Sequence, residues 1–208
     1  MKKISAPVLD EEHERGSLNK GFADYRTEAL FFMDETAKKD LPGQEFFECR
    51  FVNVTFEGDM NGCLFTDCVF ERCDFSNCDF RESVFRRCEI RLSRMTGTDF
   101  SEARFQDVSM DGCEASYANY AFSKWKNASW KDMSFTEAVF MTCGFENLEI
   151  RNCRLINADF NDTKLKGLDF SSSDISGIVL SLEKVKGAIM SSEQALACTR
   201  LLGIIVKE

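Results

Sequence analysis

The stretch from Asn61 to Ile90 reads NGCLFTDCVFERCDFSNCDFRESVFRRCEI, and its bulky apolar residues fall at every fifth position. From residue 60 to residue 180, every multiple of five is Phe, Leu, Ile, Met, Tyr or Trp, with the single exception of Ala115. The same step continues upstream, one residue out of phase, through Leu41, Phe46, Phe51 and Phe56. A period of five held over this length indicates a repeat architecture.

A second register of small residues, such as Cys63, Cys68 and Cys73, lies two positions before most of the bulky ones, with Val108, Met133, Leu148 and Leu168 as exceptions. Neither a helix, with a period of 3.6, nor a flat strand, with a period of 2, carries a strict period of five. A coil that turns every five residues does, with one large and one small side chain inward and three facing water. Four sides close a coil of about twenty residues, and stacked coils pair like strands about 4.8 Å apart.

Several repeats, among them Cys73–Asn77, Cys78–Glu82, Ala158–Asp162 and Ser173–Gly177, closely match A(D/N)Lxx, the consensus of the pentapeptide-repeat family. The chain resembles this family over residues 41–180. The resemblance implies an all-β fold, a right-handed quadrilateral β-helix. Close packing of the interior further predicts that Tyr120, Trp125 and Trp130 fill the space left by Ala115.

The two ends differ from the repeats. Residues 1–40 are expected to form a leader and cap: Asp10–Arg15 is a charge run expected in water, and Tyr25–Met33 fits a degenerate first coil or a cap. Residues 181–208 leave the frame and are expected to form a capping and dimerisation module. Ser191 and Gln194 have the spacing of a capping box. They predict a helix over Ser192–Leu202, ended by Gly203 and followed by a strand over Ile204–Val206.

The ending, with Gln194–Ala195 and Leu201–Ile204, resembles the C-terminal module of quinolone-resistance (Qnr-type) pentapeptide proteins. That resemblance implies a two-fold dimer whose acidic rod mimics duplex DNA and binds DNA gyrase or topoisomerase IV. Proteobacterial members interrupt their coils with two loops, whereas residues 60–180 run without interruption, as in mycobacterial-type relatives. The expected dimer interface consists of Leu196, Leu201, Leu202, Ile204, Ile205 and Val206.

The charge of the chain restricts its partners. The 208 residues carry a formal net charge of -9, which disfavours direct binding of nucleic acid and favours a basic partner. The twenty-residue coil makes two adjacent faces acidic and gathers Arg86, Arg87, Lys124 and Lys126 on a basic one. The expected partner-binding residues on the acidic faces are Asp59, Asp79, Glu82, Asp99, Glu102, Glu114, Glu137, Asp159 and Asp162.

Membrane insertion, export and catalysis find little support in the sequence. No apolar run reaches 18 residues, and Met1–Ile4 leads straight into charge rather than into a signal peptide, so we expect a cytoplasmic protein. No phosphate-binding loop or serine nucleophile motif is present, and convex faces lack a catalytic pocket. We therefore expect no enzymatic activity and no cofactor.

The ten cysteines invite a metal or disulfide interpretation. Nine lie in the small inward register, and from Cys63 on they are separated by five residues or a multiple of five. Zinc sites typically begin with a closer pair, so we expect structural filler and no metal. Cys68 and Cys88 fall in adjacent coils at a distance that permits a disulfide, although a reducing compartment disfavours one. His13, the single histidine, is expected to be solvated.

The function that fits these observations is a DNA-mimic protein that binds a type II topoisomerase and either inhibits it or protects it from quinolones. The alternative is a generic cytosolic interaction scaffold with another partner. Exposed charge on the acidic face is expected to steer a basic surface.

Overall fold

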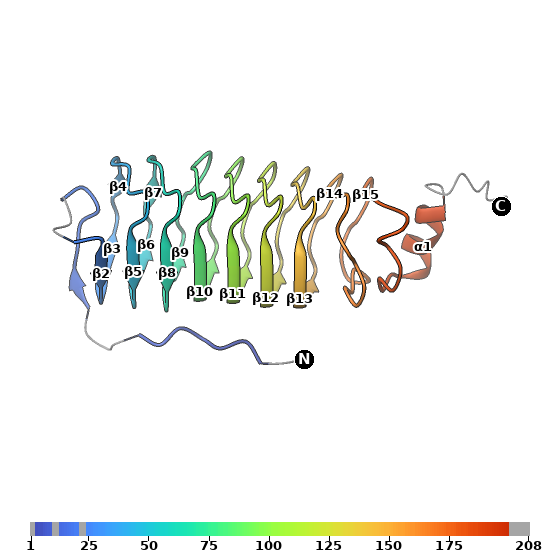
Figure 1. Ribbon diagram of the computed structural model, residues 1–208, viewed down its shortest axis with the longest axis horizontal. Helices are drawn as coiled ribbons and strands as arrows, with labels where there is room; N and C mark the ends of the chain where they lie inside the picture. The colour runs from blue at the N-terminus through green and yellow to red at the C-terminus, as the bar shows by residue number, and fades with distance from the viewer. Residues whose placement is uncertain (1–2, 10–12, 21–23, 200–208) are drawn as a thin grey trace.

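The computed structural model describes residues 3–9, 13–20 and 24–199 as a rod of stacked coils (Figure 1). Short parallel strands pair from coil to coil along the rod, and a single short helix lies at its C-terminal end. The predicted all-β solenoid is confirmed. No helix among the described residues is long and apolar enough to cross a membrane.

The strands form two ladders that merge into one. Strands β2, β5 and β8 make the first ladder, β1, β3, β6 and β9 make the second, and both pair with β10. From β10 to β13 each strand is eight residues long because it continues through a corner of the coil. The strands are β1 Glu14–Arg15, β2 Arg26–Glu28, β3 Leu30–Met33, β4 Thr36–Ala37, β5 Glu45–Phe47, β6 Arg50–Val52, β7 Thr55–Phe56, β8 Leu64–Thr66, β9 Val69–Glu71, β10 Val84–Arg91, β11 Arg104–Asp111, β12 Lys124–Lys131, β13 Gly144–Arg151, β14 Asp159–Phe160 and β15 Val179–Leu180.

The register of the strands explains the single break in the sequence period. Phe65 pairs with Phe85, twenty residues on, whereas Phe46 pairs with Phe65 after only nineteen. The coils before Met60 therefore contain one residue fewer than those after it. The shortened sides lie between Ala37 and Leu41 and between Phe56 and Met60, where the step of five becomes a step of four.

Most corners place one residue in the left-handed region of φ, two positions after the bulky one. Asn77, Asn127 and Asn157 sit there at φ of 59°, 53° and 55°, and Asn is among the residues that adopt this conformation most readily. Next to the bulky residue, an Asp often accepts a hydrogen bond from the main-chain N–H two residues on, as Asp74 does from Ser76. These local preferences turn the chain every five residues.

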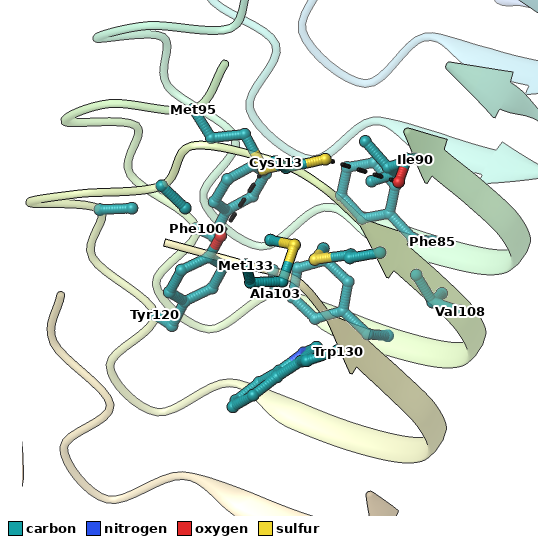
Figure 2. Close-up of a cluster of buried hydrophobic side chains, with 14 of the residues drawn as sticks. Phe85, Ile90, Met95, Phe100, Ala103, Val108, Cys113, Tyr120, Trp130 and Met133 are labelled. Atoms are coloured by element: carbon teal, nitrogen blue, oxygen red, sulfur yellow. Dashed lines mark hydrogen bonds between the residues drawn. The ribbon is translucent and has the colours of Figure 1, made fainter. Parts of the chain in front are cut away.

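The interior consists of columns of stacked rings. Phe65, Phe85 and Phe105 lie above one another with centroid separations of 5.0 and 5.1 Å. Ala115 is fully buried. The Tyr120 hydroxyl donates to the sulfur of Met95, 3.7 Å away (Figure 2). Tyr120 also packs against Phe135 at 5.9 Å. Tyr120 therefore contacts Met95 and Phe135, and the filling of the space beside Ala115 by Tyr120, Trp125 and Trp130 stays a prediction.

The stack extends beyond the predicted limits of 41 and 180. Residues 26–37 already form a coil, because β2, β3 and β4 pair with β5, β6 and β7. At the other end Ile189 bridges to Asp169, and both Val185 and Met190 are partly buried against the core. Residues 181–190 therefore continue the frame of five, which the sequence analysis ended too early.

Helix α1, Ser192–Thr199, closes the described part of the rod. Its capping box is confirmed: Ser191 N–H donates to Gln194 Oε1 at 2.8 Å, and Gln194 N–H donates to Ser191 Oγ at 3.2 Å. Gln194 Nε2 also donates to the carbonyls of Phe170 and Ser173, which anchors the helix on the last coils. The predicted helix end at Leu202, the cap at Gly203 and the strand over residues 204–206 lie outside the described residues.

Candidate interaction surface

One outer face of the rod brings together most of the predicted binding residues. Asp59, Asp79 and Asp99 stack in register from coil to coil. Glu82 and Glu102 occupy the exposed corner beside them, at φ of 59° and 61°. These five carboxylates, with Arg81 as a cation among them, form a continuous patch that we call the acidic stretch.

The acidic face does not continue unbroken along the rod. Above Asp99 the column runs through Asn119 and Val139 before it reaches Asp159. The corner column runs from Glu102 through Phe122 and Thr142 to Asp162. Two uncharged coils therefore separate Asp159 and Asp162 from the acidic stretch, so the predicted face divides into two patches.

The aspartates of the acidic stretch also stabilise the turns. Asp79 Oδ1 accepts the N–H of Arg81 at 3.0 Å, and Asp99 Oδ1 accepts the N–H of Ser101 at 2.9 Å. The Arg81 guanidinium pairs with Asp79 and holds the pKa of its carboxyl below the usual value. Reversal of Asp79 or Asp99 to Lys would remove these acceptors and so destabilise the turns. Asn keeps the acceptor oxygen and removes only the charge.

The remaining two predicted residues lie on the neighbouring face. Glu114 stacks between Arg94 and Ser134 and accepts the N–H of Ser116 at 3.0 Å. Glu137 is exposed at a corner with φ of 56°. The structure does not bring these two carboxylates into the acidic stretch, and Arg94 opposes Glu114 on its own face.

Two exposed aromatic residues border the uncharged middle of the acidic face and were not singled out in the sequence analysis. Tyr117 is 58% exposed and Phe122 is 49% exposed, and both have left-handed φ, of 60° and 62°. A bulky residue pays a steric cost in this conformation. The sequence could have indicated these two residues, because most of the equivalent positions in other repeats hold Asn, Asp, Glu or Gly.

The basic face carries exposed Arg86, Arg104, Lys124 and Lys126. Arg87, which the sequence analysis grouped with them, is turned to the corner instead, where its Nε donates to Asp67 Oδ1 at 2.7 Å. Lys164, Lys166 and Lys184 continue the positive charge toward the C-terminal end. Acidic and basic side chains therefore gather on different sides of the rod.

The cysteines and the histidine lie outside this surface. All ten cysteines are free, and nine are buried in the core, which fits the filler interpretation. Burial raises the pKa of the Cys63, Cys73 and Cys113 thiols to about 12, so they are poor nucleophiles. The described residues contain no group of three side chains suited to a metal ion. His13 is half-buried and its Nε2 lies 2.8 Å from the Glu48 carbonyl, so its predicted solvation is wrong.

The predicted dimer interface lies mostly outside the described residues, which end before Leu201, Leu202, Ile204, Ile205 and Val206. Leu196 on α1 is 52% exposed. Leu182 and Ile189 on the last coil are also exposed, at 47% and 49%. Apolar surface is thus available at this end of the rod.

Comparison with known proteins gives family matches over more than half of the chain. The pentapeptide repeat region family matches residues 63–134, and the pentapeptide repeats family (8 copies) matches residues 145–181. No curated protein sequence matches the chain.

Solved structures that match include a trypsin-treated variant of QnrB1, a plasmid-mediated fluoroquinolone resistance protein, with 16% identity and a TM-score of 0.45 over 86% of this chain and 99% of that one. HetL, a pentapeptide repeat protein involved in heterocyst differentiation regulation in Nostoc sp. strain PCC 7120, matches with 11% identity and a TM-score of 0.33, over 79% of this chain and 91% of that one. A pentapeptide repeat protein of the Arabidopsis thaliana thylakoid lumen matches with 20% identity and a TM-score of 0.37, over 52% and 69%. These similarities concern the fold alone.

Proposed function

The chain belongs to the pentapeptide repeat family, and on that premise we propose that it is a non-enzymatic DNA mimic that binds a type II topoisomerase in the cytoplasm. The partner is DNA gyrase or topoisomerase IV. Binding of the acidic stretch to the basic DNA-binding surface of the enzyme competes with DNA. The outcome is inhibition of the enzyme or its protection from quinolones.

The density of charge on the acidic stretch carries this proposal. Each of its later coils offers two carboxylates, Asp79 with Glu82 and Asp99 with Glu102. At a rise of about 4.8 Å per coil, these four carboxylates less the charge of Arg81 give one net negative charge per about 3.2 Å, against one per about 1.7 Å along duplex DNA. These separations lie within the Debye length of about 8 Å at physiological salt, so a basic partner meets a stripe of potential rather than isolated charges.

The exposed rings beside the acidic stretch support a protein partner rather than a purely electrostatic one. Tyr117 and Phe122 are exposed at two successive corners of the coil that follows Asp99 and Glu102. Aromatic side chains are enriched among the residues that carry most of the energy of protein interfaces, and their faces attract Arg and Lys. Charge would steer the encounter, and the two rings would hold the complex.

A supercoiling assay with purified gyrase, with and without ciprofloxacin, tests the proposal. The informative variant combines Asp79→Asn, Glu82→Gln, Asp99→Asn and Glu102→Gln, which removes four charges and keeps the acceptors at the two aspartates. We expect it to weaken inhibition or protection by about tenfold or more, because the stripe is lost. The effect of the wild type should fall as salt rises from about 50 to 300 mM.

The matched control removes four charges from the basic face through Arg86→Gln, Arg104→Gln, Lys124→Gln and Lys126→Gln. Arg87 is left in place because it pairs with Asp67. This control should bind as well as the wild type. Equal loss in both variants, or affinity independent of salt, would refute DNA mimicry, and a chain that neither inhibits nor protects across a wide titration would instead support the scaffold alternative.

We further propose that the C-terminal module joins two rods end to end as a two-fold dimer. The exposed Leu182, Ile189 and Leu196 provide apolar surface at this end. Because an isologous contact repeats each residue, Leu196→Asp would place two charges in one interface. Light scattering should report a dimer for the wild type and a folded monomer for the variant, and a wild type that is monomeric at micromolar concentration would contradict the proposal.

A further inference from the structure

The N-terminal segment runs along one corner of the rod, antiparallel to the direction in which the coils are stacked (Figure 1). That corner carries a chain of linked side chains, which we call the polar ladder. Arg87 Nε donates to Asp67, Asn127 Nδ2 donates to Asp107 at 3.3 Å, and Asn147 Nδ2 donates to Asn127 at 3.1 Å. The ladder consists of Asp67, Arg87, Asp107, Asn127 and Asn147.

Main-chain N–H groups of the segment bind the carboxylates of the polar ladder. Val8 N–H donates to Asp67 Oδ1 at 3.1 Å, and Ser5 N–H donates to Asp107 Oδ1 at 3.4 Å. Three extended residues span about 10 Å, and two coils rise by nearly the same distance, about 9.6 Å. Residues i and i+3 of an extended segment therefore match alternate levels of the ladder. Pro7, which has no N–H, falls between the two donors.

Burial distinguishes this corner from the others. Asp67 and Asp107 are only 6% and 9% exposed, whereas the equivalent Asn77 and Glu82 on other corners are exposed. A carboxylate is costly to bury unless hydrogen bonds replace its water. Asp67 receives these bonds from Arg87 and the Val8 N–H, and Asp107 receives them from Asn127, Gln106 and the Ser5 N–H. This corner therefore presents buried carboxylates that accept main-chain N–H groups of an extended polypeptide.

The occupant is held lightly. Two main-chain hydrogen bonds tie residues 3–9 to the ladder, and Val8 is 65% exposed. Segments with few buried contacts open at a low free-energy cost. Because both bonds use the main chain, the site recognises an extended backbone rather than particular side chains.

We propose that the polar ladder is a binding site for an extended polypeptide, read through its N–H groups at positions i and i+3, with residues 3–9 as its exchangeable occupant. A second copy of this segment, supplied in trans, takes the site when the resident segment is released. The ladder lies away from the acidic stretch, so this proposal is independent of topoisomerase binding.

The test uses the full-length chain with Val8→Pro, which removes one donor and loosens the resident segment. A fluorescently labelled synthetic peptide of residues 3–9 is titrated into this variant and into the wild type, and anisotropy is measured. We expect the variant to bind the peptide about tenfold more tightly than the wild type, whose own segment competes. Asp107→Ala in the variant background should reduce peptide binding, with a thermal melt to confirm that the rod stays folded.

Matched peptides separate main-chain recognition from nonspecific adhesion. N-methylation of Val8 deletes a donor that the ladder uses, and N-methylation of Ala6 deletes one for which the described residues show no acceptor. The first should weaken binding about tenfold, the worth of one hydrogen bond, and the second should change it little. Equal binding of both methylated peptides would overturn the proposal. So would amide exchange at Ser5 and Val8 of the wild type as fast as in the free peptide.

Discussion

The interior and the outer faces of the rod follow different rules. Inside, Phe65, Phe85 and Phe105 repeat the same ring at each level, and each ring packs on the next. Outside, the column that begins with Asp79 and Asp99 continues with Asn119 and Val139. The interior repeats similar side chains at every level, and this repetition specifies the fold. The outer faces can carry different side chains at each level, so they can specify a binding partner.

At one position of the repeat, the same side chain serves both the fold and the outer face. Asp79 and Asp99 face solvent with one side of the carboxylate, yet the other side accepts a main-chain N–H of the next turn. Glu82 and Glu102 at the corner have no such duty among the described hydrogen bonds. Experiments that alter the faces must therefore preserve the turn acceptor if binding is to be separated from stability.

Alkaline pH should disturb the interior most. Burial raises the pKa of Cys63, Cys73, Cys78 and Cys113 to about 12 and that of Cys143 and Cys153 to about 11. Because the folded pKa exceeds the unfolded one, the stabilisation is complete below pH 9 and is lost as pH rises toward the folded values. Across that window, each thiol lowers the free energy of unfolding by about 1.4 kcal/mol for every unit by which the pH rises.

We therefore expect cooperative loss of the β-sheet circular dichroism signal between pH 9 and 11. Cys73→Ala should move the midpoint upward, since it removes one titrating thiol from the core. Identical thermal melts at pH 8 and above pH 10 would contradict the linkage.

Adding a ring should be costly inside and cheap outside. Ala115→Phe enlarges a fully buried residue beside the Tyr120 ring and should destabilise the chain by about 1–3 kcal/mol. Thr142→Phe places the same ring at an exposed corner next to Phe122 and serves as the control. Thermal melts check both, and a neutral Ala115→Phe would mean that space beside Ala115 is empty.

The two tryptophans sharpen the comparison within the interior. Trp125 Nε1 donates to Ser123 Oγ at 2.8 Å, whereas Trp130 Nε1 is buried without a partner in the described part of the chain. Trp125→Phe should therefore lower the free energy of unfolding by about 1 kcal/mol more than Trp130→Phe, since only the former breaks a satisfied bond. Urea titrations of the two variants measure the difference, and the reverse order would be inconsistent with this bonding.

Replacement of Phe122 should have the smallest effect on stability, and it should stabilise the rod rather than destabilise it. Its φ of 62° is better tolerated by Asn, so Phe122→Asn should stabilise the rod by about 0.5–1 kcal/mol. The same change should weaken gyrase binding if the ring is an anchor. Asn77→Gln, at an exposed corner with φ of 59°, replaces a residue well suited to left-handed φ and should have the opposite sign. A destabilised Phe122→Asn would show instead that the ring packs on its own surface.

The arrangement of the interior could be predicted from the amino-acid sequence. The inward register, the twenty-residue coil, the shortened coils before Met60 and the capping box of α1 all follow from residues close together in the chain, whose side chains alternate with a fixed local period. The stacking of Asp79 on Asp99 follows as well, because a constant coil length converts sequence spacing into position on a face. The continuation of the frame through Val185 and Met190 was readable in the same way.

Contacts between residues far apart in the sequence became known only from the folded structure. Ser5 meets Asp107 and Val8 meets Asp67, and no periodic pattern records contacts at such separations. The structure likewise turned Arg87 toward Asp67 and away from Arg86, and it gave His13 the carbonyl of Glu48. Local sterics fix which side of the coil a residue faces, but the choice of partner depends on every group that lies within reach once the chain has folded.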